Sequence, residues 1–177
     1  MSYLVVCSLA RLAETARRHR PGHMLTVLSQ GTAVDRPAGI APDRHLHLSF
    51  NDIAAAAPGL VSPAEAHMRA IVDFARRWDR AAPLLIHCFA GVSRSTASAY
   101  VIAAALDPAR EEAELARELR LRSPTATPNR RLVALGDAML GRQGRMVAAI
   151  GAIGRGADCF EGEPFVLPLR AEDAGLF

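Results

Sequence analysis

The chain has 177 residues, which is long enough for one domain with its own core and too short to suggest two. Half of the residues are apolar and no run approaches the roughly 18 apolar residues that span a bilayer, so we expect no membrane partner. The net charge of +3 is too small and too evenly spread to indicate binding to nucleic acid, and composition does not indicate an oligomeric state.

The first third of the chain alternates between two kinds of element. No basic region precedes the apolar residues near the start, unlike a secretory signal, so we expect a cytoplasmic protein. Residues 3–7 and 24–28 are predicted as strands, separated by a helix over about 8–19. Residues 45–50 alternate into a third strand, with Leu46, Leu48 and Phe50 on one face.

The next elements bracket a short loop. Ser62-Pro63-Ala64-Glu65 is typical of a helix start, with Ser62 as the cap, and apolar residues at three- and four-residue spacing extend this helix to about residue 80. Residues 84–86 are wholly apolar, as in a central strand covered on both faces. Residues 95–106 are small and apolar on all sides, which predicts a buried helix.

The last part of the chain is less regular. Two further helices are predicted over 108–121 and 128–142, starting at Asp107-Pro108 and Thr127-Pro128. Residues 165–169 are interpreted as either a strand or a docking segment. The pattern predicts an α/β fold with a central, mostly parallel sheet of four to five strands flanked by helices. We expect residues 1–143 to form the functional domain and residues 144–177 to be an extension that packs on it.

The segment between the central strand and the buried helix is the candidate site. It reads His87-Cys88-Phe89-Ala90-Gly91-Val92-Ser93-Arg94-Ser95. Backbone amides of a loop that opens a helix can converge on an anion, and Gly91 allows the backbone to turn tightly. Arg94 adds a planar guanidinium that matches two oxygens of a tetrahedral oxyanion. The same positive field favours the thiolate of Cys88, the form of cysteine that acts as a nucleophile.

These nine residues resemble the signature of the protein tyrosine phosphatase superfamily, His-Cys-x-x-Gly-x-x-Arg-Ser/Thr, and match every fixed position. Ala90 and Ser93 also match the fuller form found in the dual-specificity branch. The resemblance implies a phosphatase-type phosphate-binding loop between a central strand and a buried helix. In that loop the backbone of Phe89, Ala90, Gly91, Val92 and Ser93 would hold the phosphate oxygens together with Arg94.

The resemblance also implies roles for individual side chains. Cys88 would form a cysteinyl-phosphate, and Ser95 would ease release of the thiolate when this intermediate breaks down. His87 would order the loop by hydrogen bonding beneath it. Asn129, which follows Pro128 as in the family, would support the arginine or the loop, although Ser123 stands where the family usually has arginine.

A carboxylic acid must protonate the leaving group, and in the family it follows a strand some tens of residues before the cysteine. Asp52 fits this position because it comes directly after the predicted strand over 45–50. Asp35 and Asp43 are the alternatives, but both precede that strand. We therefore expect Asp52 to be the general acid.

The three cysteines, Cys7, Cys88 and Cys159, form no Cys-x-x-Cys pair and indicate neither a disulfide framework nor a zinc site. We expect Cys7 to be an apolar residue of an inner strand, although it could also act as a resolving thiol for an oxidised Cys88. No cofactor or metal is expected.

The sequence thus predicts a metal-independent phosphomonoester hydrolase, and a protein-tyrosine or dual-specificity phosphatase above all. Its substrate would be a phosphorylated protein or a small phosphomonoester. The alternatives are a phosphatase of small-molecule phosphates, a non-catalytic module of the same fold that binds a phosphorylated ligand, and a sulfurtransferase.

Overall fold

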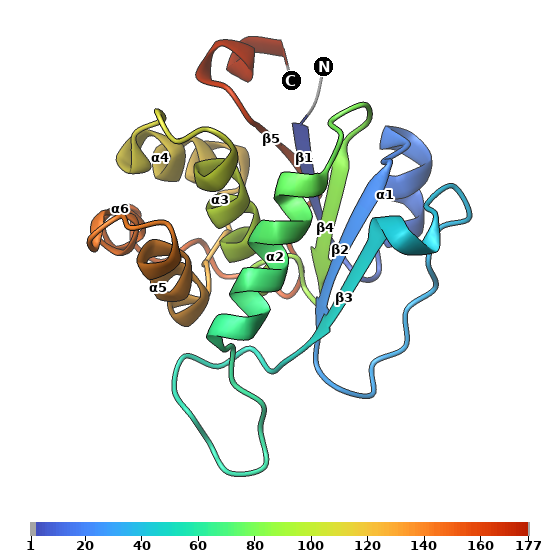
Figure 1. Ribbon diagram of the computed structural model, residues 1–177, viewed down its shortest axis with the longest axis horizontal. Coiled ribbons are helices and arrows are strands. Elements are labelled where there is room, and N and C mark those ends of the chain that lie inside the picture. Colours follow the sequence, from blue (N-terminus) through green and yellow to red (C-terminus); the bar gives the residue numbers. More distant parts are fainter. Residues whose placement is uncertain (1–2, 177) are drawn as a thin grey trace.

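A five-stranded sheet forms the centre of the computed structural model, which describes residues 3–176 (Figure 1). The strand order is β3-β2-β4-β1-β5; β1 to β4 run parallel, and β5 pairs antiparallel with β1. The strands are β1 (Tyr3–Ser8), β2 (His23–Leu28), β3 (His45–Ser49), β4 (Leu84–Cys88) and β5 (Phe165–Pro168). The predicted α/β class and mostly parallel sheet are confirmed, and the apolar run over 84–86 is indeed the central strand.

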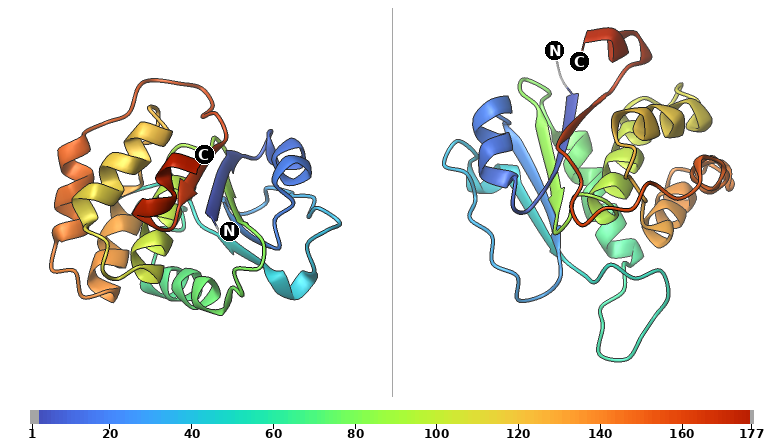
Figure 2. Two further views of the ribbon diagram at one scale, coloured as in Figure 1. Left: turned by 90° about the horizontal axis from the view of Figure 1, so that it is seen from above. Right: turned by 180° about the vertical axis from the view of Figure 1, so that it is seen from behind.

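Helices cover both faces of this sheet (Figures 1 and 2). Helix α1 lies on one face, and the others lie on the opposite face. The helices are α1 (Leu12–His19), α2 (Glu65–Arg77), α3 (Arg94–Leu106), α4 (Glu112–Arg122), α5 (Arg130–Met139) and α6 (Arg145–Ile153), with 3₁₀ turns at Pro42–Arg44 and Ala171–Leu176. Among the described residues, no helix is long and apolar enough to cross a membrane.

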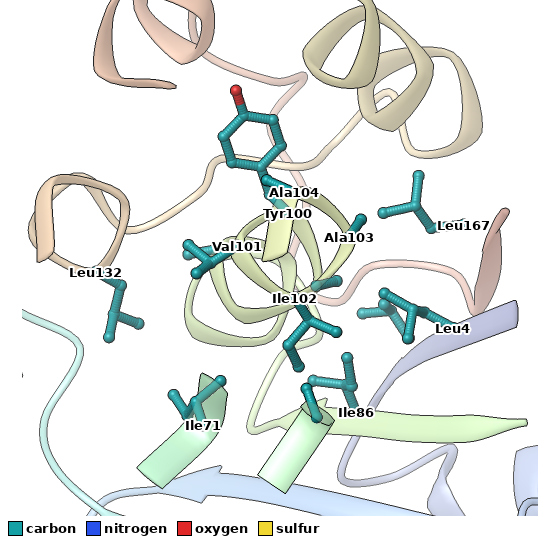
Figure 3. Close-up of a cluster of buried hydrophobic side chains, with 14 of the residues drawn as sticks. Leu4, Ile71, Ile86, Tyr100, Val101, Ile102, Ala103, Ala104, Leu132 and Leu167 are labelled. Atoms are coloured by element: carbon teal, nitrogen blue, oxygen red, sulfur yellow. The ribbon is translucent and has the colours of Figure 1, made fainter. Parts of the chain in front are cut away.

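Helix α3 lies at the centre of the main hydrophobic core, surrounded by side chains from the sheet and from other helices (Figure 3). Every residue from Arg94 to Ala104 is buried, as its small, apolar sequence predicts. Tyr100 is the largest of these side chains, and its hydroxyl donates to the carbonyl of Glu112 (3.0 Å). Helix α3, which follows the candidate loop, is therefore packed against other elements on all sides.

Four helices (α1, α2, α4 and α5) begin later than the sequence predicts. Helix α1 starts at Leu12 rather than at about residue 8. Helix α2 starts at Glu65 with Ala64 as its N-cap, and the ring of His67 accepts from the amide of Ala64 (3.1 Å); Ser62 is not the cap. Helix α4 starts at Glu112, because residues 108–110 form a turn in which the amide of Arg110 donates to the carbonyl of Asp107 (3.2 Å).

Helix α5 also starts later than predicted, at Arg130 rather than at Pro128. Asn129 is its N-cap, and its side-chain oxygen accepts from the amides of Arg131 and Leu132, each at 3.1 Å. Two amides at the start of the helix are thus satisfied by one side chain, as expected for an asparagine cap.

The last part of the chain contributes to the same core. Helix α6 packs against α4 and α5, and β5 extends the sheet beside β1. Their side chains Met146, Ile150, Phe165 and Leu167 belong to the main hydrophobic cluster. Between them, residues 154–164 cross from the helical layer to the edge of the sheet (Figure 2).

Candidate active site

The loop over residues 89–93 joins the carboxyl end of β4 to the amino end of α3, where parallel α/β sheets place their ligands. The carbonyls of Phe89, Ala90 and Val92 each accept a hydrogen bond from an amide outside the loop. The donors are, in that order, Leu9 (3.0 Å), Gly162 (2.9 Å) and Thr127 (2.9 Å). Because these carbonyls are held on the outer side, the arrangement favours peptide N–H groups on the inner side, which is the geometry of an anion-binding nest.

Gly91 has a conformation and a position that a side chain would disturb. Its φ is +73°, in the left-handed region, and a Cβ there would lie 2.8 Å from the amide nitrogen of Ser8 and 2.9 Å from the carbonyl carbon of Cys7. The loop therefore packs directly on the end of β1. In this position the amide of Gly91 donates to the sulfur of Cys88 (3.2 Å).

Cys88 ends β4 at the base of the loop and is 2% exposed. Its Sγ lies 3.1 Å from the hydroxyl of Ser95, in the first turn of α3. A peptide N–H, a hydroxyl and the positive end of the 13-residue α3 thus surround one sulfur atom. This environment stabilises negative charge on the sulfur.

Arg94 opens α3 and is 5% exposed. Its Nη1 donates to the carbonyl of Phe50 (2.8 Å) and to the hydroxyl of Ser29 (3.2 Å), which fixes the guanidinium from two neighbouring segments. Its Nε is buried and has no hydrogen-bond partner among the described residues, and it lies 3.8 Å from the carboxylate of Asp52. A buried guanidinium N–H without a partner is a donor available to an anionic ligand.

Asp52 comes after β3 and lies beside the loop, at the carboxyl end of the sheet. Its Oδ1 accepts from the hydroxyl of Ser93 and from the side-chain amide of Asn129, both at 2.7 Å. The side chain keeps 35% of its surface exposed, and its other oxygen, Oδ2, is the one that lies 3.8 Å from Nε of Arg94.

The two alternative carboxylates lie elsewhere. Asp43 is in the 3₁₀ turn that precedes β3, at the opposite end of that strand from Asp52. Asp35 lines a separate cavity of about 760 Å³ between α1 and the loop over residues 33–40. Of the three predicted candidates, the structure brings Asp52 together with Arg94 and the loop over residues 89–93.

His87 is fully buried in β4 directly before the cysteine. Its Nε2 is 2.8 Å from the hydroxyl of Thr26 on the neighbouring strand β2, and the same hydroxyl lies 2.8 Å from Nε2 of His45. Burial lowers the pKa of His87 to about 4, so the ring is neutral at neutral pH. The side chain is thus hydrogen-bonded beneath the loop rather than exposed to a ligand.

Cys7 lies on the other face of the sheet from Cys88. It belongs to the smaller hydrophobic cluster under α1, whereas Cys88 belongs to the main one. Burial raises the pKa of the Cys7 thiol to about 12, which keeps it protonated. Cys159 is exposed. Within residues 3–176, no group of three or more His, Cys, Asp or Glu side chains could hold a metal ion.

Several contacts of the candidate site were not predicted from the sequence, and three of them involve its main groups. The hydroxyl of Ser29 accepts a hydrogen bond from Arg94, and the hydroxyl of Thr26 is hydrogen-bonded to His87. The amide of Gly162 donates to the carbonyl of Ala90. The contact of Thr26 follows from the pairing of β2 with β4, and Ser29 comes directly after β2, so both become visible only once the strand order is known. Gly162 is far along the chain, and nothing in its local sequence marks it.

No protein-family model and no curated protein matches the sequence. Solved structures do resemble it. One of them is the structure of DUSP15, to which the chain is 15% identical with a TM-score of 0.58. The similarity covers 85% of this chain and 96% of that one. It is 21% identical to the Yvh1 phosphatase domain from Chaetomium thermophilum, with a TM-score of 0.54 and coverage of 80% and 92%.

A third similar structure is a candidate dual specificity phosphatase of mouse, solved with zinc tungstate. The identity is 17% and the TM-score 0.55, with 78% of this chain and 80% of that chain covered. The chain therefore has the fold of the dual-specificity phosphatases.

Proposed function

We propose that the protein is a phosphomonoester hydrolase that uses Cys88 as its nucleophile. The observation that carries this proposal is the convergence of the Gly91 amide and the Ser95 hydroxyl on the sulfur of Cys88, at 3.2 and 3.1 Å. A structural cysteine in a core needs no such donors, whereas a thiolate nucleophile does. The fold of the similar phosphatases supports the same reading.

In the first step, the thiolate of Cys88 attacks phosphorus, a sulfur–phosphorus bond forms and the ester oxygen leaves. The loop amides and the free Nε of Arg94 hold the phosphoryl oxygens, whose charge spreads in the transition state. Asp52 gives its proton to the leaving oxygen. Its place beside Arg94 and the loop supports this role over Asp35 and Asp43.

In the second step, water attacks the phosphorus of the cysteinyl-phosphate and gives its proton to the carboxylate of Asp52. The sulfur–phosphorus bond breaks, and inorganic phosphate leaves. The hydroxyl of Ser95 then donates to the sulfur as negative charge returns to it, which makes the thiolate a better leaving group. Asn129 and Ser93 position Asp52, and His87 supports the loop from below.

A phosphorylated protein is the substrate class that we propose, with phosphotyrosine preferred and phosphoserine or phosphothreonine also accepted. Two of the similar structures are of dual-specificity phosphatases by name. The loop residues Phe89, Ala90 and Val92 add no positive charge to Arg94, which suits a single phosphate group better than a polyphosphorylated lipid headgroup. No metal takes part in this scheme.

The test is a panel of p-nitrophenyl phosphate, phosphopeptides and small metabolite-like phosphates, with the wild type beside Cys88→Ser. We expect hydrolysis of p-nitrophenyl phosphate and phosphotyrosine peptides that EDTA does not reduce and that Cys88→Ser abolishes. Binding of phosphopeptides to Cys88→Ser without turnover in the wild type would favour the non-catalytic module. Loss of activity in EDTA would contradict the thiolate mechanism.

A further inference from the structure

Two exposed aromatic side chains flank the phosphate-binding loop. Phe89 follows the nucleophile directly and is 60% exposed, and Phe160, in the segment between α6 and β5, is 94% exposed. Large apolar side chains this exposed on a soluble domain are informative when they cluster. Together they line one cavity of about 260 Å³, whose other lining residues are Leu9, Ala10, Ala90 and Glu161.

The segment that carries Phe160, residues 154–163, is held at its start by residues of the helical layer. At its start, Arg120 donates to the carbonyl of Gly154 (2.8 Å), and the amide of Ala157 donates to the carbonyl of Pro124 (2.9 Å). Figure 2 shows this segment passing between the helical layer and the strand ends. Its path is therefore set by contacts on the helical side.

The end of the same segment is bound to the loop itself. The amide of Gly162 donates to the carbonyl of Ala90 (2.9 Å), and a Cβ on Gly162 would lie 3.2 Å from the carbonyl oxygen of Gly91. The carboxylate of Glu161 accepts from the buried hydroxyl of Ser8, beside Cys88 in the sheet. Phe160 is thus held at a defined place next to the catalytic loop although its ring is in solvent.

We propose that this cavity is a substrate subsite, which binds an apolar side chain adjacent to the phosphorylated residue of a protein substrate. The inference rests on the proposed function and adds a sequence preference to it. Phe89 follows Cys88 directly and lines the cavity together with Ala90, so the cavity borders the loop that would hold the phosphate and is placed to receive a residue next to the phosphorylated one. The volume is below the roughly 300–1,000 Å³ of small-molecule sites and suits a single side chain.

The groups around the cavity favour an apolar occupant over an acidic one. Glu161 is its one ionisable lining residue, and its carboxylate is occupied by Ser8 and lies 3.9 Å from Arg11. Arg11 in turn is paired with Glu14 (3.1 Å) and Glu163 (3.3 Å). These groups carry one positive and three negative charges, so the surroundings disfavour an acidic occupant, and the two phenyl rings of the lining favour an apolar one by burial of apolar surface.

The test uses two phosphotyrosine peptides that are identical except for the residues on both sides of phosphotyrosine, which are leucine in one and serine in the other. We expect the wild type to hydrolyse the leucine peptide with a kcat/KM about tenfold higher, mainly through a lower KM, as burial of part of one leucine predicts. In Phe160→Ala the ratio of kcat/KM for the leucine peptide to that for the serine peptide should fall to about two or less. Phe160→Leu should restore most of the tenfold ratio. Activity on the serine peptide should not change.

Leu121→Ala is the matched control, because Leu121 is an exposed apolar residue on α4 (74%) outside the cavity. An unchanged leucine-to-serine ratio in Phe160→Ala, or no preference in the wild type, would overturn the subsite. If no peptide is hydrolysed, the proposed function fails, and the subsite is tested by the affinities of Cys88→Ser for the two peptides. Equal affinities of Cys88→Ser for the two peptides would then overturn the subsite. A preference of Cys88→Ser for the leucine peptide that is lost when Phe160→Ala is added would support it.

Discussion

The side-chain amide of Asn129 donates a hydrogen bond to the carboxylate of Asp52 over 2.7 Å, although 77 residues separate them in the chain. The side-chain oxygen of Asn129 caps α5, because it accepts hydrogen bonds from two backbone N–H groups at the start of this helix. One side chain therefore links the start of a helix to the loop that carries the proposed general acid.

These two functions of Asn129 can be separated by substitution. Asn129→Ser keeps an oxygen that caps α5, whereas Asn129→Ala removes it and should lower the free energy of unfolding by about 1 kcal/mol. Both variants lose the amide that holds Asp52, so we expect both to lose at least about tenfold in kcat through misplacement of the acid. Thermal unfolding and kcat are the measurements. Full activity in Asn129→Ser would mean that the contact does not position Asp52.

Asp52→Asn should slow hydrolysis most where the leaving group needs a proton most. For an alkyl phosphate we expect a loss of about 10²–10⁴-fold in kcat, the usual contribution of a general acid, and a smaller loss for p-nitrophenyl phosphate, whose phenolate leaves more easily. Asp35→Asn and Asp43→Asn are the controls and should keep wild-type rates. If one of them shows the leaving-group effect instead, the acid has been misassigned.

Gly91→Ala and Gly59→Ala form a matched pair. Both glycines have left-handed backbones, with φ of +73° and +74°, but a Cβ at Gly91 meets the end of β1 within 3 Å whereas one at Gly59 meets nothing within 4 Å. Each should cost roughly 1 kcal/mol of stability from the backbone conformation. We expect Gly91→Ala alone to lose phosphatase activity and vanadate binding. Equal activity of the two variants would show that the close packing of the loop on β1 is dispensable.

Stability should fall as the pH drops below neutral because His87 is buried as a neutral ring. Its pKa is lowered from 6.5 to about 4, chiefly by burial. Between these values the unfolded chain binds the proton and the folded one does not, so the free energy of unfolding rises with pH across this window. At pH 5 the free energy of unfolding is lower than at neutral pH by about 2 kcal/mol from His87 alone.

Thermal unfolding of the wild type, His87→Gln and His47→Gln at pH 7 and pH 5 measures this effect. His47 is the control because its side chain is exposed on β3. The difference in stability between the two pH values should shrink in His87→Gln and stay as in the wild type in His47→Gln. The same difference in all three proteins would assign the acid sensitivity to other groups.

Local patterns were sufficient to predict the strands and the loop. The apolar run after Pro83 has the composition of a strand buried on both faces, and it is β4; the small residues that follow Arg94 form the buried α3. The site residues of this segment are neighbours in sequence, so their clustering could be predicted from the chain alone. The place of Asp52 was predicted from the resemblance and from its position after β3.

Helix starts were less predictable, because capping residues have other possible partners. Thr127 was expected to cap a helix, but its amide donates to the carbonyl of Val92 and its hydroxyl accepts from the amide of Gly156 (3.2 Å). Tertiary contacts thus use the groups that a cap would need, and Asn129 caps α5 instead.

The final third of the chain was predicted least well. Helix α6 has nine residues, the last three of them in the glycine-rich stretch over 151–156, and gives a weak helical pattern. The strand β5 depends on β1, at the other end of the chain, for its pairing. The contact of Gly162 with the loop depends on both elements, which is why it could not be anticipated from local sequence.

The most direct test of the account is to detect the cysteinyl-phosphate itself. The wild type and Ser95→Ala are mixed with p-nitrophenyl phosphate, quenched in acid, digested and analysed by mass spectrometry. We expect phosphate on the peptide that contains Cys88, with more of it in Ser95→Ala because breakdown of the intermediate is slowed. Rapid hydrolysis with no phosphate on Cys88 in either protein, or undiminished hydrolysis by Cys88→Ser, would contradict the account.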